Sequence, residues 1–399
     1  MNRSLISTLI SLIVSFFIFP FAIYAGTYKV TSSISTVDGT NFCDGGACTS
    51  EDSIIIEAGK RGSLKIKNFN GLGSYIKITN EDRNPDERVE IVQSNDKWPL
   101  VLENCHYIDL RGDGDDDSNF IKNCGIKVTH NSAMKGPAAL TIKGSGSNIK
   151  VSYLELTNIG TGTNADGIKV GLGNEGELLL YHTLEIHHNY IHDIKYAGMY
   201  IGLDDAPGKP YLDNIKIHHN LLENIDAYGI TLKRIHYSSV TPSEIFNNTV
   251  RNTGLNTTKN GLFKKGIGVS YFFGSYAKIY DNVIENTAGP GIKVARGDGH
   301  QVYSNKLVNN GTHDEENFGH GITVTTSATN SAIFNNKIIN PKRYGIYVQG
   351  SSGLANRLYG NEVIDPGIGD YYAKTPEDMI VGDYSDGKTM KVKGVKVLN

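Results

Sequence analysis

Basic and phenolic side chains recur beside a short phrase that is repeated from residue 167 onward. The phrase is glycine, an aliphatic residue, any residue and usually a second aliphatic residue, and it occupies positions 167–170, 198–201, 229–232, 266–269, 291–294, 321–324 and 345–348. The residue between the two aliphatic positions is in turn Lys169, Tyr200, Thr231, Gly268, Lys293, Thr323 and Tyr347. If the phrases align in space, these side chains form one stripe of cations, phenols and small groups.

Such a stripe can do chemistry on an anionic ligand. Lysine and arginine neutralise a carboxylate, which acidifies the proton on the adjacent carbon. A neighbouring lysine, arginine, histidine or tyrosine with a suitable pKa can remove that proton. The candidate catalytic residues are Lys233, Arg234, His236, Lys293 and Arg296, and the candidate ligand-binding residues are Lys169, Tyr200, Tyr271 and Tyr347. The alternative is that lysine and tyrosine merely cover an exposed strand face.

A second repeated phrase indicates which elements must hold this stripe. It contains an asparagine between an aromatic or histidine position and an aliphatic one, and its asparagines are Asn189, Asn220, Asn248, Asn282, Asn305, Asn336 and Asn361. The period-two alternation predicts strands, and each repeat is too short to hold a substantial helix as well. Stacked coils would pair their strands in parallel about 4.8 Å apart, with residues such as Ile168 and Ile230 facing inward. The sequence therefore predicts an all-β solenoid with stacked asparagine amides at one turn.

These two phrases resemble the right-handed parallel β-helix repeats of the pectate-lyase-like superfamily. The resemblance is strong over 150–365 and weaker over 50–150. It implies a right-handed parallel β-helix over 61–365, an N-terminal cap over 26–60 and a C-terminal cap or tail over 366–399, because solenoid ends must cover core and strand edges. It does not by itself assign a reaction, since the superfamily includes lyases, hydrolases, epimerases, esterases, phage tailspikes and adhesins.

With the stripe, the resemblance leads us to expect a secreted enzyme that cleaves a polysaccharide containing uronic acid by β-elimination. A non-catalytic surface or glycan-binding solenoid is the alternative from another class, because nothing in the sequence forces catalysis. A C5-epimerase uses the same proton abstraction and stays open at this point. The expected partner is an acidic polysaccharide.

Three short segments resemble polygalacturonase motifs and raise a hydrolase as a further alternative. They are 164–167, with Asp166, then Asp204 with Asp205, and 319–321, with His320. Inverting hydrolysis needs two carboxyl groups that flank one bond and admit water. In this sequence Asp166 precedes its strand whereas Asp204 and Asp205 follow theirs, and His320 lies five coils, roughly 24 Å, beyond Asp166. The spacing therefore disfavours this reaction.

Calcium is the one cofactor for which the sequence offers ligands. Related lyases use Ca²⁺ to bind uronates, so Asp204 and Asp205 are candidate ligands, with Asp213 nearby. The acidic loop at 113–117 is a second candidate, although a solvated turn explains either cluster. The histidine pairs at 187–188 and 218–219 also suggest a metal site at first. Repeat alignment instead places His187 and His218 in a stacked column with Phe246, Tyr280, Tyr303, Phe334 and Tyr359.

Composition and the N-terminus indicate the compartment. The 399 residues include 39 Lys plus Arg and 42 Asp plus Glu, a net charge of −3, which argues against a nucleic-acid-binding protein. Arg3, an apolar run from Leu9 to Ile23 and Ala25 form a signal-peptide pattern over 1–25. We therefore expect a secreted, periplasmic or cell-surface protein that is not held in a membrane once the signal is removed.

The cysteines are consistent with an oxidising destination. Cys43 and Cys48 can close a tight glycine-rich loop, and Cys105 and Cys124 are a second candidate pair on neighbouring coils. Neither spacing is that of a structural zinc site.

Overall fold

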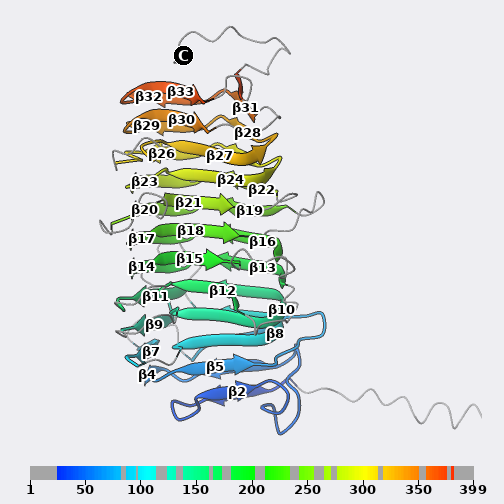
Figure 1. The fold of residues 1–399 in the computed structure, drawn as a ribbon. Helices are drawn as coiled ribbons and strands as arrows, with labels where there is room; N and C mark the ends of the chain where they lie inside the picture. Colours follow the sequence, from blue (N-terminus) through cyan, green and yellow to red (C-terminus); the bar gives the residue numbers. More distant parts are fainter. Residues whose placement is uncertain are drawn as a thin grey trace, which may run out of the picture.

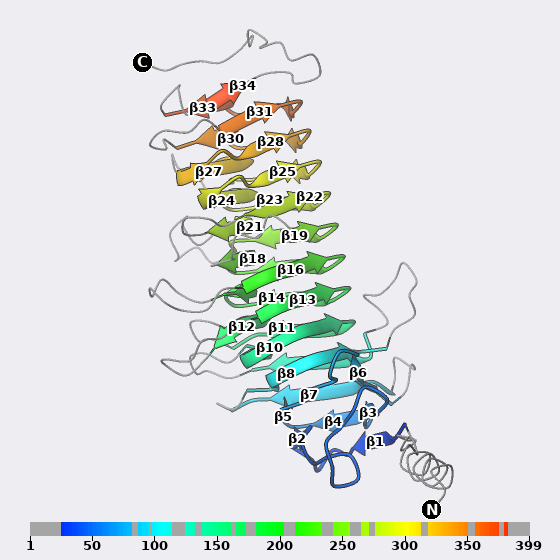
Figure 2. The same cartoon turned by 90° about the vertical axis from the view of Figure 1, so that its right-hand side faces the viewer.

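The computed structural model describes residues 25–81, 87–95, 98–113, 124–131, 138–160, 165–172, 181–202, 212–233, 242–255, 265–270, 276–312, 318–349, 356–374 and 379–381. Within these residues the chain winds into one stack of coils, from β1 and β2 at one end to β33 and β34 at the other (Figures 1 and 2). Every strand-to-strand pairing of the stack is parallel. The predicted right-handed parallel β-helix is confirmed.

The strands of the successive coils line up on three faces of the stack. The first face holds β2 (Thr36–Asp38), β5 (Leu64–Lys67), β12 (Ile168–Leu172), β15 (Ala197–Ile201), β18 (Tyr228–Lys233), β21 (Lys265–Ser270), β24 (Ile292–Asp298), β27 (Ile322–Thr329), β30 (Tyr344–Val348) and β33 (Gly369–Ala373). The second face holds β1 (Thr27–Val30), β3 (Ser53–Ile56), β6 (Ile76–Asn80), β13 (Tyr181–His187), β16 (Leu212–His218), β19 (Ser243–Phe246), β22 (Ala277–Tyr280), β25 (Gln301–Tyr303), β28 (Ala332–Phe334), β31 (Asn356–Tyr359) and β34 (Met379–Val381).

The third face is a sheet of its own. It holds β4 (Gly59–Arg61), β7 (Val89–Gln93), β9 (Ile126–His130), β11 (Leu154–Asn158), β14 (Tyr190–Ile194), β17 (Leu221–Ile225), β20 (Thr249–Thr253), β23 (Val283–Thr287), β26 (Lys306–Val308), β29 (Lys337–Ile339) and β32 (Glu362–Ile364). Two long strands, β8 (Leu100–Arg111) and β10 (Leu140–Ser152), run from the first face into the second and join those two faces into one sheet.

Inward aliphatic side chains form a continuous core along the axis. Ile168 pairs in register with Met199, and Met199 pairs with Ile230. The same column continues strand by strand to Ile346. These side chains are fully buried. Burial at about 25 cal/mol per Å² of apolar surface makes this ladder the main stabilising feature of the fold.

The turn between the second and third faces is held by the predicted asparagine ladder. The amide of each asparagine donates to the side-chain oxygen of the next, for example from Asn220 to Asn248 at 2.9 Å and from Asn248 to Asn282 at 3.0 Å. The ladder runs without a break from Asn189 to Asn361. Each amide also donates to backbone carbonyls, so the turn leaves these buried polar groups paired.

The aromatic column beside this turn is also confirmed. Successive rings stack with centroids 4.7–5.0 Å apart and nearly parallel planes. The column is His187, His218, Phe246, Tyr280, Tyr303, Phe334 and Tyr359. The histidines at its N-terminal end are therefore part of a structural stack.

The outer side of the second face carries a ladder of alternating charge that the repeat alignment did not single out. Its members pair in register in the order Lys77, Asp109, Lys150, Glu185, Lys216, Glu244 and Lys278. Lys150 lies 3.5 Å from Glu185, and Glu244 lies 3.8 Å from Lys278. A slip of one coil would place like charges opposite each other, so this ladder helps to fix the register.

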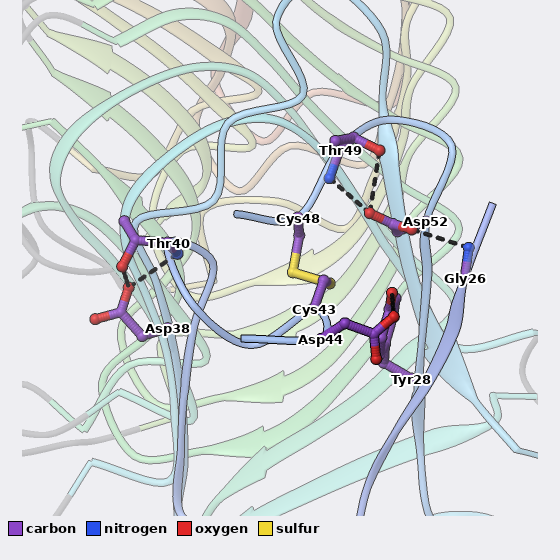
Figure 3. The surroundings of a disulfide bond; sticks show 9 residues. All are labelled: Gly26, Tyr28, Asp38, Thr40, Cys43, Asp44, Cys48, Thr49 and Asp52. Carbon is purple, nitrogen blue, oxygen red and sulfur yellow. Dashed lines mark hydrogen bonds between the residues drawn. A yellow bond between two sulfur atoms is a disulfide. The ribbon is translucent and has the colours of Figure 1, made fainter. Parts of the chain in front are cut away.

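The N-terminal end is closed by a small disulfide loop. Cys43 and Cys48 are bonded, as predicted, and the nearby Asp52 accepts hydrogen bonds from the backbone of Gly26 at 2.9 Å and of Thr49 at 2.7 Å (Figure 3). The second candidate pair was wrong, because Cys105 and Cys124 are not joined. Both thiols are buried, and burial raises the pKa of each to about 12, which makes them unreactive.

The predicted signal peptide, residues 1–25, lies almost wholly outside the described residues. Among the residues that are described, no helix is long and apolar enough to span a membrane.

Candidate functional site

The predicted stripe lies on the outer side of the first face. Lys169 pairs with Tyr200, Tyr200 with Thr231, and Thr231 with Gly268. The column then continues through Lys293, Thr323 and Tyr347. The alternation of each strand turns these side chains away from the core, because their neighbours in sequence are the buried aliphatic residues.

Tyr200 belongs to a small apolar cluster that is separate from the core. Ala197, Ala227 and Tyr228 complete the cluster, and Tyr196 packs against it. Tyr200 is 8% exposed and Tyr228 6%. The stripe is therefore a partly dehydrated surface, on which electrostatic interactions are stronger than in water.

Two lysines contact the Tyr200 ring from neighbouring strands. Lys233, at the end of β18, donates a hydrogen bond to the Tyr200 hydroxyl, and its Nζ lies 4.6 Å from the ring centroid. The Nζ of Lys169, on β12, lies 5.6 Å from the same centroid and 3.9 Å from Asp166 Oδ2. Because the cation of Lys233 donates to the phenol oxygen, it stabilises negative charge on that oxygen.

A third lysine, Lys265, is the residue that sequence reasoning missed. It opens β21, pairs in register with Tyr228, and places its Nζ 4.4 Å from the Tyr228 ring centroid. The residue is only 8% exposed. Burial, together with the charges of Lys293 and Lys233, holds the pKa of Lys265 well below its usual range. A lysine with a depressed pKa thereby lies close to the side chains of Lys233 and Lys293.

A signal for Lys265 existed in the sequence. The residue before the glycine of each phrase forms its own column, which reads Asp166, Ala197, Tyr228, Lys265, Pro290, His320 and Tyr344. Lysine stands out there, but the alignment considered only positions after the glycine.

Gly268 leaves the space that the Lys265 side chain occupies. A Cβ at position 268 would collide with Cε of Lys265 and lie 2.7 Å from its Cδ. Gly268 is thus the point in the column where a side chain is missing and a lysine from the same strand fills the gap.

Lys293, on the next strand, completes the group of cations. It pairs in register with Gly268, and its Nζ lies 6.0 Å from the Phe318 ring centroid. Burial lowers the pKa of Lys293. The column neighbours Thr231 and Thr323 are buried, and their hydroxyls have no hydrogen-bond partner among the described residues.

The other predicted site residues divide into two groups. Arg296 is exposed on β24, and Tyr347, on β30, is 4% exposed and stacks on His320 with centroids 4.3 Å apart. These strands are three and five places along the first face from β15, which carries Tyr200. Arg234, His236, Tyr271, Asp204 and Asp205 lie outside the described residues. Their predicted roles stay predictions.

The two polygalacturonase-like segments that the structure describes, at 165–167 and 319–321, do not lie together. Asp166 is buried before β12 and accepts a hydrogen bond from the backbone of Ala197 at 3.3 Å. His320 is buried before β27, five coils away. Each of the two has a packing role where it stands.

The described part of the chain contains no group of three or more His, Cys, Asp or Glu side chains arranged to hold a metal ion. The stripe instead offers several lysines, one of which has a depressed pKa, and a phenol. This set can bind an anion, accept a proton from carbon and donate a proton to oxygen.

Residues 141–363 match the protein family described as right handed beta helix region. A sequence search of curated proteins finds no match. Among solved structures, an alginate lyase from Paenibacillus sp. str. FPU-7 is similar at 13% identity and a TM-score of 0.46, over 87% of this chain and 98% of that chain. Pectate lyase Pel9A has 13% identity and a TM-score of 0.46, over 89% of this chain and 80% of that chain.

DFA-IIIase from Arthrobacter chlorophenolicus A6, in complex with GF2, has 11% identity and a TM-score of 0.48, over 89% of this chain and 87% of that chain. Likeness at this level of identity leaves the reaction open.

Proposed function

We propose that this chain, which belongs to the right-handed β-helix family, is a lyase that cleaves a uronic-acid-containing polysaccharide by β-elimination. The observation that carries the proposal is the neutral-amine candidate Lys265 beside Lys233, whose ammonium is hydrogen-bonded to the Tyr200 hydroxyl.

Lys265 is the proposed base. β-Elimination begins with removal of the proton on C5, next to the uronate carboxylate, and an amine can take that proton only when it is neutral. Burial and the neighbouring charges of Lys293 and Lys233 depress the pKa of Lys265. This direction of shift favours the neutral form that the first step needs.

Tyr200 is the proposed acid. As the bond from C4 to the glycosidic oxygen breaks, the C4–C5 double bond forms and the leaving oxygen takes the phenol proton of Tyr200. The phenolate is stabilised by the ammonium of Lys233, which already donates to this oxygen. The cycle closes when Lys265 loses the proton it gained and Tyr200 regains one from solvent.

Lys293 and Lys169 are the proposed carboxylate-binding residues. Both are half-buried and lie in the same outward column as Tyr200. A cation against the reacting carboxylate stabilises the charge that develops when the C5 proton leaves. A second cation farther along the stripe would hold the carboxylate of a neighbouring sugar.

The described residues of this site do not fit a calcium ion. Lysine amines repel a cation, and calcium requires six to eight oxygen ligands. The lysines supply the positive charge that calcium would otherwise supply to a uronate. We expect activity to persist when the protein is assayed in a chelator such as EDTA, and a full loss that added Ca²⁺ restores would assign a ligand role to residues such as Asp204 and Asp205.

The proposal includes export. The apolar run from Leu9 to Ile23, ending at Ala25, supports it. Expression of the full chain in a secreting host should yield a protein whose N-terminus is Gly26.

The direct test incubates the protein with pectate, alginate, glucuronan and glycosaminoglycans. Ultraviolet absorbance of the new double bond and reducing ends are followed together. Both should rise at equal molar rates. Reducing ends without absorbance would indicate hydrolysis, and tight binding without either signal would indicate a glycan-binding solenoid.

A further inference from the structure

The described candidates for acid and base all approach a ligand from the same side. Tyr200, Lys233 and Lys265 belong to three consecutive strands of the first face, β15, β18 and β21. Lys233 reaches back by one strand to Tyr200, and Lys265 reaches back by one strand to Tyr228. The reactive atoms therefore gather over β15 and β18, on the outer side of one sheet.

Their position on the sheet is fixed from both directions. Tyr200 and Tyr228 pack in one apolar cluster with Ala197 and Ala227, so neither ring can turn away from this surface. Lys265 crosses the gap at Gly268, where any added Cβ would collide with it. A sugar ring that lies flat along the stripe would meet base and acid on the same face.

That arrangement has a stereochemical consequence. In β-elimination from a uronate, the base takes the hydrogen on C5 and the acid protonates the oxygen on C4. When both groups act from one side, the C5 hydrogen and the C4 oxygen must lie on the same face of the ring. D-Mannuronate and D-glucuronate meet this condition, whereas D-galacturonate and L-guluronate place the two groups on opposite faces.

Resting on the proposed function, we propose that this site performs a syn elimination and that its substrate is a polymer of uronate with the manno or gluco configuration. Tyr200 and Lys265 act on the same ring face, and Lys233 holds the Tyr200 phenol in place through its hydrogen bond. The arrangement also disfavours C5 epimerisation, because inversion requires a proton to return to the opposite face.

The test compares four homopolymers and one mixed polymer with the full chain. Initial rates of double-bond formation are measured on polymannuronate, glucuronan, polyguluronate and polygalacturonate. The expected result is a kcat/KM on polymannuronate or glucuronan that exceeds the values on the other two by about tenfold or more. A larger value on polyguluronate or polygalacturonate would overturn the syn assignment and leave the lyase proposal standing.

An alternating mannuronate–guluronate polymer separates reaction stereochemistry from polymer affinity, because both configurations lie in one chain. Elimination at mannuronate leaves guluronate at the new reducing end, which nuclear magnetic resonance identifies. If the protein acts on this polymer, guluronate reducing ends are expected, and mannuronate reducing ends would overturn the inference. If a glycosaminoglycan yields a double bond while none of the five polymers does, the substrate inference fails and the lyase proposal stands. If no polymer yields one, the proposed function fails and the inference fails with it.

Discussion

The ammonium of Lys233 lies 4.6 Å from the centre of the Tyr200 ring and donates a hydrogen bond to its hydroxyl. The two residues come from adjacent strands of the first face and are 33 positions apart in the sequence. Neither residue has an apparent need for the other in building the core, which is already formed by the inward aliphatic side chains. In the proposed function, the pair is a phenol prepared to carry negative charge.

Replacing the Tyr200 hydroxyl should therefore slow the reaction without unfolding the protein. In Tyr200→Phe we expect kcat to fall by about 10²–10⁴-fold, the range for loss of a general acid, with a much smaller change in KM. Steady-state rates of double-bond formation measure both. The matched control is Tyr303→Phe, which removes a hydroxyl from the stacked column on the second face. An equal loss of kcat in both variants would remove Tyr200 from the mechanism.

Lys265→Met should separate activity from stability. Activity is expected to disappear because the base is lost. The free energy of unfolding at neutral pH is expected to increase, because the native state no longer buries an amine whose pKa is depressed. Denaturant titration measures the second effect, and Lys278→Met, in the outer charge ladder, is the control. Retention of activity in Lys265→Met would contradict the assignment of the base.

The pH dependence follows from the same depressed pKa. Activity of the unmodified protein should rise with pH as Lys265 becomes neutral, with the midpoint well below the usual lysine range. For stability, a depressed native pKa means that the unfolded chain binds the proton more tightly. The stability gap between Lys265→Met and the unmodified protein should thus widen as pH falls from the unfolded-state pKa toward the native one. A gap that narrowed on acidification would contradict the cause given for the shift.

Gly268→Ala tests how Lys265 is positioned. Gly268 has no unusual backbone angle, so alanine should be accepted by the strand and should instead displace the Lys265 side chain. We expect a lower kcat and an acidic limb of the pH–rate profile that moves to higher pH, because a displaced lysine is less buried. Gly62→Ala is the control, since a Cβ there would meet nothing within 4 Å. An unchanged pH profile in Gly268→Ala would contradict this positioning role.

The buried asparagine ladder should be far more sensitive to substitution than the exposed asparagine ladder that contains Asn286. Asn282 is buried and donates to Asn305 Oδ1 and to two backbone carbonyls, so Asn282→Asp replaces donors with a buried carboxylate facing oxygen atoms. We expect a loss of about 3–5 kcal/mol in the free energy of unfolding. Asn286 lies in an exposed ladder in which Asp193 already fills an equivalent position. Asn286→Asp should cost less than about 1 kcal/mol, and equal losses in urea titrations would contradict this account of the turn.

The repeats allowed the fold to be predicted because a solenoid converts sequence spacing directly into spatial register. The spacing of the Gly-Ile phrase predicts that Lys169, Tyr200 and Lys293 lie in one column, and the strand register confirms this prediction. The asparagine ladder and the aromatic stack followed in the same way. Each depends on an identical local geometry that recurs in every coil.

The site was less predictable because its chemistry depends on departures from the repeat. The pKa of Lys265 is lowered by burial and by the charges of two lysines on other strands. The sequence of a single coil predicts neither effect. Cys105 and Cys124 show the same limit, since a plausible spacing did not bring their sulfur atoms together. Residues such as Arg234 and Asp204 fall in segments without the repeat, where alignment provides no register.

The most direct test of the central claim is a single time course on polymannuronate and glucuronan that records ultraviolet absorbance and reducing ends, with Lys265→Met run in parallel. We predict that both signals rise together with the unmodified protein on at least one of these polymers and that neither rises with the variant. Reducing ends that appear without absorbance, or equal absorbance from the variant, would contradict β-elimination by Lys265.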